Sequence, residues 1–139
     1  MTTLLASLMW PGLTEKSENT LTIKVSGIKN KNGYISVALH DGTSDFPNGE
    51  GFKTVSVDAE RGTVEIIMEG VPDGEYAIAL MHDENANDEF DMESNGMPLE
   101  GWGFSNNPQS NMGPATWSEA SFDVEGDQEI KIDMMYLNY

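Results

Sequence analysis

Short stretches in which apolar and polar residues alternate constrain the fold of this chain more than any other feature. In the first stretch, Leu21, Ile23 and Val25 are separated by single polar residues. That is the pattern of a strand with one buried face. The same alternation recurs along the chain and predicts about seven strands, at 21–26, 34–40, 52–58, 63–68, 75–82, 121–124 and 129–136.

Turn-forming residues separate these stretches, with Asn32–Gly33 and Gly126–Asp127 as the clearest examples. No long amphipathic helix is indicated, and residues 115–120 are expected to form at most one helical turn. The pattern favours an all-β fold, an antiparallel β-sandwich of the immunoglobulin or transthyretin type with long loops at one end. A barrel is the alternative, because periodicity does not separate the two.

The length of 139 residues suits one domain, which we place at 19–139. Residues 1–18 contain an apolar run that is too short to cross a bilayer, so no transmembrane segment is expected. Two interpretations of this run are open: a remnant of an export signal, or an apolar arm that packs on this domain or on a neighbouring copy. Its apolar residues are Leu4, Leu5, Leu8, Met9, Trp10 and Leu13.

The charge balance excludes some partners. Seven basic and 24 acidic residues give a formal charge of −17, which repels nucleic acid and anionic membrane surfaces. The chain has no cysteine, so disulfides and thiolate metal sites are excluded. The acidic surplus is explained either by a self-repelling, soluble surface or by binding of a divalent cation.

The acidic residues are densest just after the fifth expected strand. Asp83, Asn85, Asn87 and Asp91 occupy positions 1, 3, 5 and 9 of a loop, and Glu89 stands at position 7, where a backbone carbonyl serves as a ligand. Ca²⁺ takes about six to eight oxygen ligands of these kinds. The sequence therefore predicts a Ca²⁺-type cation site with Asp83, Asn85, Asn87, Glu89, Asp91 and Glu93 as ligands.

This loop departs from the EF-hand pattern, because Asp88 replaces the glycine of position 6 and Ser94 replaces the acid of position 12. No flanking helices are expected either, so the site would be a loop on a β scaffold. The alternative is a solvated acidic loop shaped by Asx-turns, with no bound ion.

A second candidate is a binding loop that comprises His82, Glu100, Trp102, Phe104, Ser105 and Asn106. Glycines bracket its two aromatic residues, and exposed aromatics on a rigid loop stack on sugars or contact a protein partner. The alternative is that the loop folds over one end of the sandwich and its aromatics fill the core. By alternation, His82 is expected at the edge of the core and His40 on the exposed face.

The segments HDENANDEFD (82–91) and GMPLEGWGFSNN (96–107) occur together in this chain, and VPDGEY (71–76) precedes the fifth strand. With them, residues 21–136 resemble a bacterial domain-of-unknown-function family of small exported proteins. VPDGEY is also similar to the carboxypeptidase-regulatory and transthyretin-like sandwiches. The resemblance implies an exported β-sandwich and supplies no catalytic residues.

No nucleophile elbow, phosphate loop or dinucleotide fingerprint is present in the sequence. We therefore expect a non-enzymatic module, secreted, periplasmic or on the cell surface, that binds a divalent cation and serves a binding or structural role. A protein or a carbohydrate is the expected further partner. Two alternatives remain: a self-assembling structural subunit that uses the apolar arm, and a hydrolase that uses carboxylates near His82.

Overall fold

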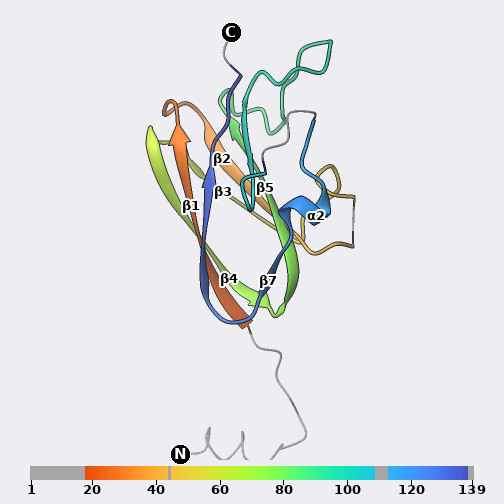
Figure 1. The fold of residues 1–139 in the computed structure, drawn as a ribbon. Coiled ribbons are helices and arrows are strands. Elements are labelled where there is room, and N and C mark those ends of the chain that lie inside the picture. The colour runs from red at the N-terminus through yellow and green to blue at the C-terminus, as the bar shows by residue number, and fades with distance from the viewer. Residues whose placement is uncertain (1–17, 44, 109–112, 138–139) are drawn as a thin grey trace, which may run out of the picture.

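The computed structural model describes residues 18–43, 45–108 and 113–137, so the apolar arm of the sequence lies outside the described residues. Two β-sheets face each other, and the long connections gather at one end of them and along one side (Figure 1). The elements of the described residues are β1 Glu18–Ile28, β2 Tyr34–His40, β3 Lys53–Asp58, β4 Gly62–Pro72, β5 Gly74–Asp83, β6 Gly101–Phe104, α2 Trp117–Ala120, β7 Phe122–Val124 and β8 Gln128–Asp133.

The smaller sheet has the order β4-β1-β8. Strand β4 runs antiparallel to β1, whereas β8 runs parallel to it, so this one pair departs from the antiparallel pairing of the other strands. The turn before β8 brings the chain back to the start of β1. There the backbone N–H of Thr20 donates to Asp127, and the N–H of Gly126 donates to Asn19.

The larger sheet has the order β3-β2-β5-β6, and β7 pairs with the first residues of β5. The pairings within this sheet are antiparallel. The two sheets are joined at one edge, where Trp102 of β6 exchanges two backbone hydrogen bonds with Met135, just past β8. The all-β sandwich predicted from the alternation is confirmed, with eight strands in the described residues.

The core lies between the sheets and is built from the apolar phase of each strand. Residues that alternate in the sequence are fully buried on one face, because a strand points successive side chains to opposite sides. The side chains with 0% exposure include Leu21, Ile23, Val25, Ile35, Val37, Leu39, Ile78 and Ile132. The predicted hydrophobic pattern and the observed core therefore coincide.

Two elements differ from the sequence prediction. Strand β6 lies where the sequence predicts a loop. Its glycines interrupt the alternation that marks an ordinary strand, and they allow close packing against the C-terminal segment. Strand β4 continues beyond the predicted end at residue 68, through Gly70 with its φ of 71°, to Pro72. The expected helical turn near residues 115–120 is present as α2, with Thr116 as its N-cap in a capping box with Glu119.

Candidate functional site

The loop that follows β5 is closed by the carboxylate of Asp83. This side chain is the last of β5 and is 2% exposed. Its Oδ1 accepts a hydrogen bond from the backbone N–H of Asn87 at 3.2 Å, and its Oδ2 accepts one from the N–H of Asp88 at 2.8 Å. Ala86 and Asp88 have φ values of 55° and 63°, which fold the backbone back over the carboxylate.

The side chains at loop positions 3, 5 and 9 meet. Nδ2 of Asn85 donates to Oδ2 of Asp91 at 2.5 Å, and Nδ2 of Asn87 donates to Oδ1 of the same carboxylate at 2.9 Å. The amide oxygens of both asparagines accept backbone N–H groups two residues further along, as in Asx-turns. The alternate spacing thus gathers three oxygen-bearing side chains at one point of the loop.

The side chain of Glu100 joins the two ends of this loop. It is 5% exposed, and its carboxylate accepts hydrogen bonds of 3.0 Å from the backbone N–H groups of Glu84 and Asp91. Burial raises the pKa of Glu100, and the nearby charges of Asp91 and Asp83 raise it further, while the two backbone hydrogen bonds lower it. The sequence assigns Glu100 to the aromatic binding loop; the structure joins it to the acidic loop.

The other two predicted ligands lie apart from this group. Glu89 and Glu93 are exposed, and Glu93 belongs to a turn closed by the hydrogen bond from Gly96 N–H to its carbonyl. Within the described residues, no three histidine, aspartate or glutamate side chains are grouped to hold a metal ion. A cation at this loop would therefore depend on amide and carbonyl oxygens as well as carboxylates.

His82 is fully buried, as its phase predicts, and both ring nitrogens have partners. Nε2 lies 2.6 Å from the carbonyl oxygen of Asn32, and Nδ1 lies 2.7 Å from the hydroxyl of Tyr136. Because a carbonyl only accepts, Nε2 carries a hydrogen, and in the ring form with that single hydrogen Nδ1 accepts from the Tyr136 hydroxyl. His82 therefore joins the β1–β2 turn to the C-terminal segment.

We expect Tyr136→Phe to destabilise the protein by about 1–2 kcal/mol. The change leaves the buried Nδ1 of His82 without its donor and removes the acceptor of the Lys29 backbone N–H at 3.2 Å. The measurement is urea unfolding. Tyr34→Phe is the matched control, since Tyr34 is 41% exposed and should change by less than about 0.5 kcal/mol. Equal losses in the two variants would show that the Tyr136 hydroxyl has no such role.

The glycines of the aromatic segment let the C-terminal segment cross β6. A Cβ on Gly101 would lie 2.3 Å from the Tyr136 ring, and one on Gly103 would lie 2.9 Å from Ile132. Trp102 and Phe104 are half-buried. Phe104 contacts Phe46 with ring centroids 6.0 Å apart, so this aromatic packs on the outer face of the larger sheet and not into the end of the core.

Ser105 and Asn106 fix the segment around α2. Ser105 is fully buried, accepts the backbone N–H of Ile78 and donates to the carbonyl of Ala120 at 2.6 Å. Asn106 donates through Nδ2 to the carbonyls of Glu119 and Ser121. The side chains of Ser105 and Asn106 are thus engaged within the fold.

The expectation that His40 is exposed is wrong, because its side chain is 1% exposed. His40 does point to the outer face of its sheet, as alternation predicts, but Phe46 covers it with ring centroids 5.1 Å apart. Burial lowers the pKa of His40, and the charge of Asp41 opposes this. The covering segment is an irregular connection, which strand periodicity does not reveal.

Comparison with known proteins assigns the chain to a family. Residues 23–132 match the profile described as "Uncharacterized protein conserved in bacteria (DUF2141)". The chain belongs to this family. The DUF2141 match spans β1 to β8 and includes the acidic loop and Glu100. Searches of curated proteins and of solved structures find no match. Among the described residues of this DUF2141 chain, no helix has the length and hydropathy needed to span a membrane.

Proposed function

We propose that this protein is a non-enzymatic β-sandwich module whose loop 83–91 binds a Ca²⁺-type cation, and that it serves a binding or structural role outside the cytoplasm. The convergence of Asn85, Asn87 and Asp91 carries this proposal. The amide Nδ2 groups of Asn85 and Asn87 both donate to the Asp91 carboxylate, so three oxygen-bearing side chains lie together, and a hard cation takes several ligands of these kinds.

Uncompensated negative charge gives the second support. Asp83 and Glu100 are buried, and the negative charges of Asp91 and Asp83 both act on Glu100 and raise its pKa. Within the described residues, no salt bridge reaches any of these three carboxylates. Like charges at such short range repel one another, and a divalent cation would replace that repulsion with attraction.

The two amides must turn over to become ligands, which gives up the backbone hydrogen bonds that their oxygens accept. A half-turn of a side-chain amide exchanges its oxygen for its nitrogen. In Asn85 and Asn87 this would direct oxygens, in place of N–H groups, toward the cation beside Asp91. Ca²⁺ suits such a site better than Mg²⁺, because Ca²⁺ accepts many protein oxygens in flexible geometry, whereas Mg²⁺ retains several waters.

We expect added Ca²⁺ to raise the melting temperature and EDTA to reverse the rise. At a free Ca²⁺ concentration about 100 times Kd, binding adds about 2.7 kcal/mol to the free energy of unfolding. Asp91→Asn should reduce this response strongly, since it removes the carboxylate on which both amides converge. Glu93→Gln is the matched control, because it removes the same charge at an exposed position nearby.

Calorimetric titration with Ca²⁺ and then with Mg²⁺ completes the test, with Ca²⁺ expected to bind more tightly. A wild-type protein that shows neither heat nor a melting shift at millimolar Ca²⁺ contradicts the proposal. So does an Asp91→Asn variant that responds as strongly as Glu93→Gln.

A further inference from the structure

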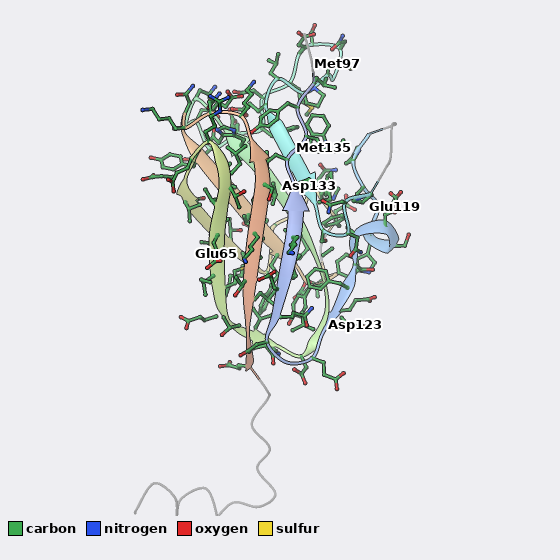
Figure 2. The ribbon with its side chains drawn as sticks, turned by 60° about the vertical axis from the view of Figure 1, so that its left-hand side comes forward. Glu65, Met97, Glu119, Asp123, Asp133 and Met135 are labelled. Carbon is green, nitrogen blue, oxygen red and sulfur yellow. The ribbon has the colours of Figure 1, made fainter. Side chains whose placement is uncertain are left out.

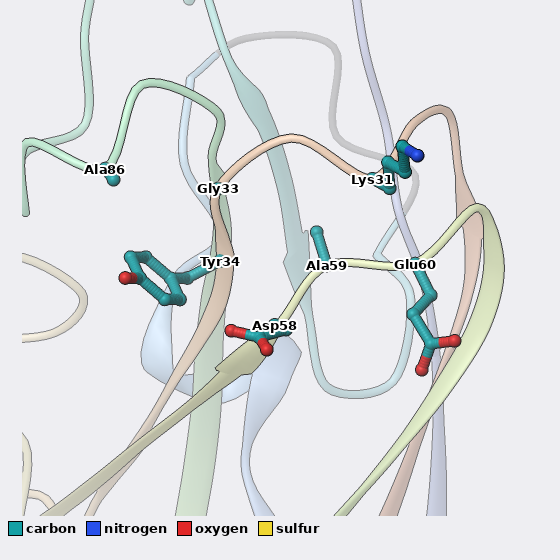
Figure 3. Close-up of a pocket in the computed structure, with 7 residues that line it drawn as sticks. All are labelled: Lys31, Gly33, Tyr34, Asp58, Ala59, Glu60 and Ala86. Atoms are coloured by element: carbon teal, nitrogen blue, oxygen red, sulfur yellow. The ribbon is translucent and has the colours of Figure 1, made fainter.

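Strand β2 carries two ring side chains on its outer face, and they differ in exposure. Tyr34 at the start of the strand is 41% exposed (Figure 3), whereas His40 at its end is 1% exposed. Within the part of the chain that the structure describes, Nδ1 of His40 is the one buried side-chain nitrogen or oxygen without a hydrogen-bond partner. Buried polar atoms are normally paired, because an unpaired one loses its hydration without compensation. The position of His40 is thus unfavourable for a polar ring.

An aromatic side chain keeps His40 from water. Phe46 belongs to the covering segment, residues 45–52, which leads into β3, and its ring packs across the His40 ring with centroids 5.1 Å apart and an interplanar angle of 87°. The same Phe46 ring contacts Phe104 of β6 at 6.0 Å and Trp117 of α2 at 5.9 Å, and Figure 1 shows α2 beside the connection between β2 and β3. The place of Phe46 therefore decides whether water reaches His40.

The charged groups around His40 form no salt bridge with it in the described residues. The charge that acts on His40 is that of Asp41, but Oδ1 of Asp41 already accepts the backbone N–H of Thr43 at 3.0 Å and its hydroxyl at 2.6 Å. Burial lowers the pKa of His40 from 6.5, and the Asp41 charge opposes this without reversing it. The other titratable side chains of the neighbouring segments, of which none acts on the pKa of His40, are Asp45, Glu50, Lys53, Glu75, Tyr76 and Glu119.

We propose that His40 and Phe46 form a pH-sensitive switch, in which protonation of the His40 ring moves Phe46 away and opens the covering segment. A protonated imidazole carries a hydrogen on both nitrogens. In the closed arrangement, Nδ1 would then be a buried, charged donor without an acceptor, which is far less favourable than the buried neutral ring. Opening brings the imidazolium into water and lets it turn toward the Asp41 carboxylate.

The sign of the pH dependence follows from the burial of the neutral ring. The closed form is fully stable above the ordinary pKa of 6.5, and this stability is lost as the pH falls through the lower pKa of the covered ring. The switch is separate from the cation loop, since His40 pairs with Ala77 near the start of β5, whereas Asp83 ends that strand and pairs with Tyr34. It therefore operates whether or not a cation is bound.

The experiment is an NMR titration of the full chain from neutral to acidic pH, in EDTA. The chain has two histidines, so the imidazole signal of His40 is readily assigned. We expect it to titrate with a midpoint below 6.5. The indole signal of Trp117 should shift with the same midpoint. The amide of Gly49, which donates to the carbonyl of Asp45 within the covering segment, should lose exchange protection in the same step, after correction for intrinsic rates. The amide of the core residue Val37 should stay protected.

Three variants test the roles of the two rings. Phe46→Ala removes the cover and should bring the His40 midpoint back toward 6.5. Phe52→Ala is the matched control, because it removes a ring that is 46% exposed in the same segment and contacts Tyr76 instead; the His40 midpoint should not change. His40→Gln has no proton to gain and should abolish the acid response of Trp117 and Gly49.

Each part of the proposal has an outcome that overturns it. A wild-type His40 that titrates at or above 6.5 would mean that the Phe46 ring stabilises the imidazolium. Signals of Trp117 and Gly49 that do not follow the His40 midpoint, or that respond equally in His40→Gln, would show that no opening is coupled to this proton. Equal midpoints in Phe46→Ala and Phe52→Ala would exclude Phe46 as the cover, and loss of Val37 protection in the same step would show global unfolding in place of a switch.

Discussion

Gly33→Ala is expected to destabilise the protein by about 3–5 kcal/mol. Gly33 has a φ of 68°, a conformation that costs an L-residue about 1–2 kcal/mol. The larger effect is steric, since a Cβ at this position would lie 1.8 Å from the backbone oxygen of Asp83. Backbone does not move aside as a flexible side chain does, so the β1–β2 turn must separate from the first residue of the acidic loop.

The matched control is Gly96→Ala. Gly96 also has a positive φ, of 86°, but no atom lies within 4 Å of the position its Cβ would take. This variant should therefore lose only about 1 kcal/mol. Urea unfolding of both variants separates the conformational cost from the clash. If the two variants lose the same stability, the close approach of the β1–β2 turn to Asp83 does not exist in solution.

The fold was largely predictable because its signal is local. Each core strand alternates with period two, and a side chain's face follows directly from its position in the sequence. Pairing order is different, since it depends on contacts between distant segments. Nothing in the residues around Ile23 or Ile130 indicates that β1 and β8 pair in parallel.

The spacing of the polar residues in the acidic loop was readable from the sequence, whereas the contact of Glu100 with this loop was not. Asn85, Asn87 and Asp91 stand two and four residues apart, so the convergence of these three side chains follows from a tight turn. Glu100 is remote in sequence and reaches the loop only because β6 pairs with β5, which places Gly101 opposite His82. That pairing could not be expected from a segment whose glycines interrupt the strand pattern.

The burial of His40 and the exposure of Tyr34 illustrate the same limit on the outer face of the larger sheet. Alternation places both side chains on this face, but an irregular connection covers His40 and leaves Tyr34 exposed. Figure 2 shows side chains that project from the surface of the sandwich.

Glu100→Ala is expected to destabilise the protein by about 3 kcal/mol, because it leaves two backbone N–H groups without their acceptor. These are the N–H groups of Glu84 and Asp91, each 3.0 Å from the carboxylate. Both ends of the acidic loop should then loosen, which predicts faster amide hydrogen exchange at these two residues. Urea unfolding and exchange measured by NMR check the two effects. Asp123→Ala, at an exposed strand position, is the control for loss of a carboxylate.

The Glu100→Gln variant keeps a side-chain oxygen that can accept the hydrogen bonds but removes the charge. The pH dependence of its stability therefore shows the effect of the charge alone. The pKa of Glu100 is raised from 4.5, mainly by burial, so the folded protein favours the protonated carboxyl more than the unfolded chain does. Its contribution to stability is therefore complete below the ordinary pKa and is lost as the pH rises through the folded-state value. Relative to Glu100→Gln, the wild type should gain stability as the pH is lowered from neutrality toward about 4.

The difference between the two proteins is the quantity to measure, since protonation of the other acidic residues affects both alike. Unfolding free energies from urea titrations at several pH values give this difference directly. A difference that stays constant across the range would mean that Glu100 is solvated as a free carboxylate. If the wild type instead loses stability relative to Glu100→Gln on acidification, the two backbone hydrogen bonds to the Glu100 carboxylate outweigh the burial of its charge.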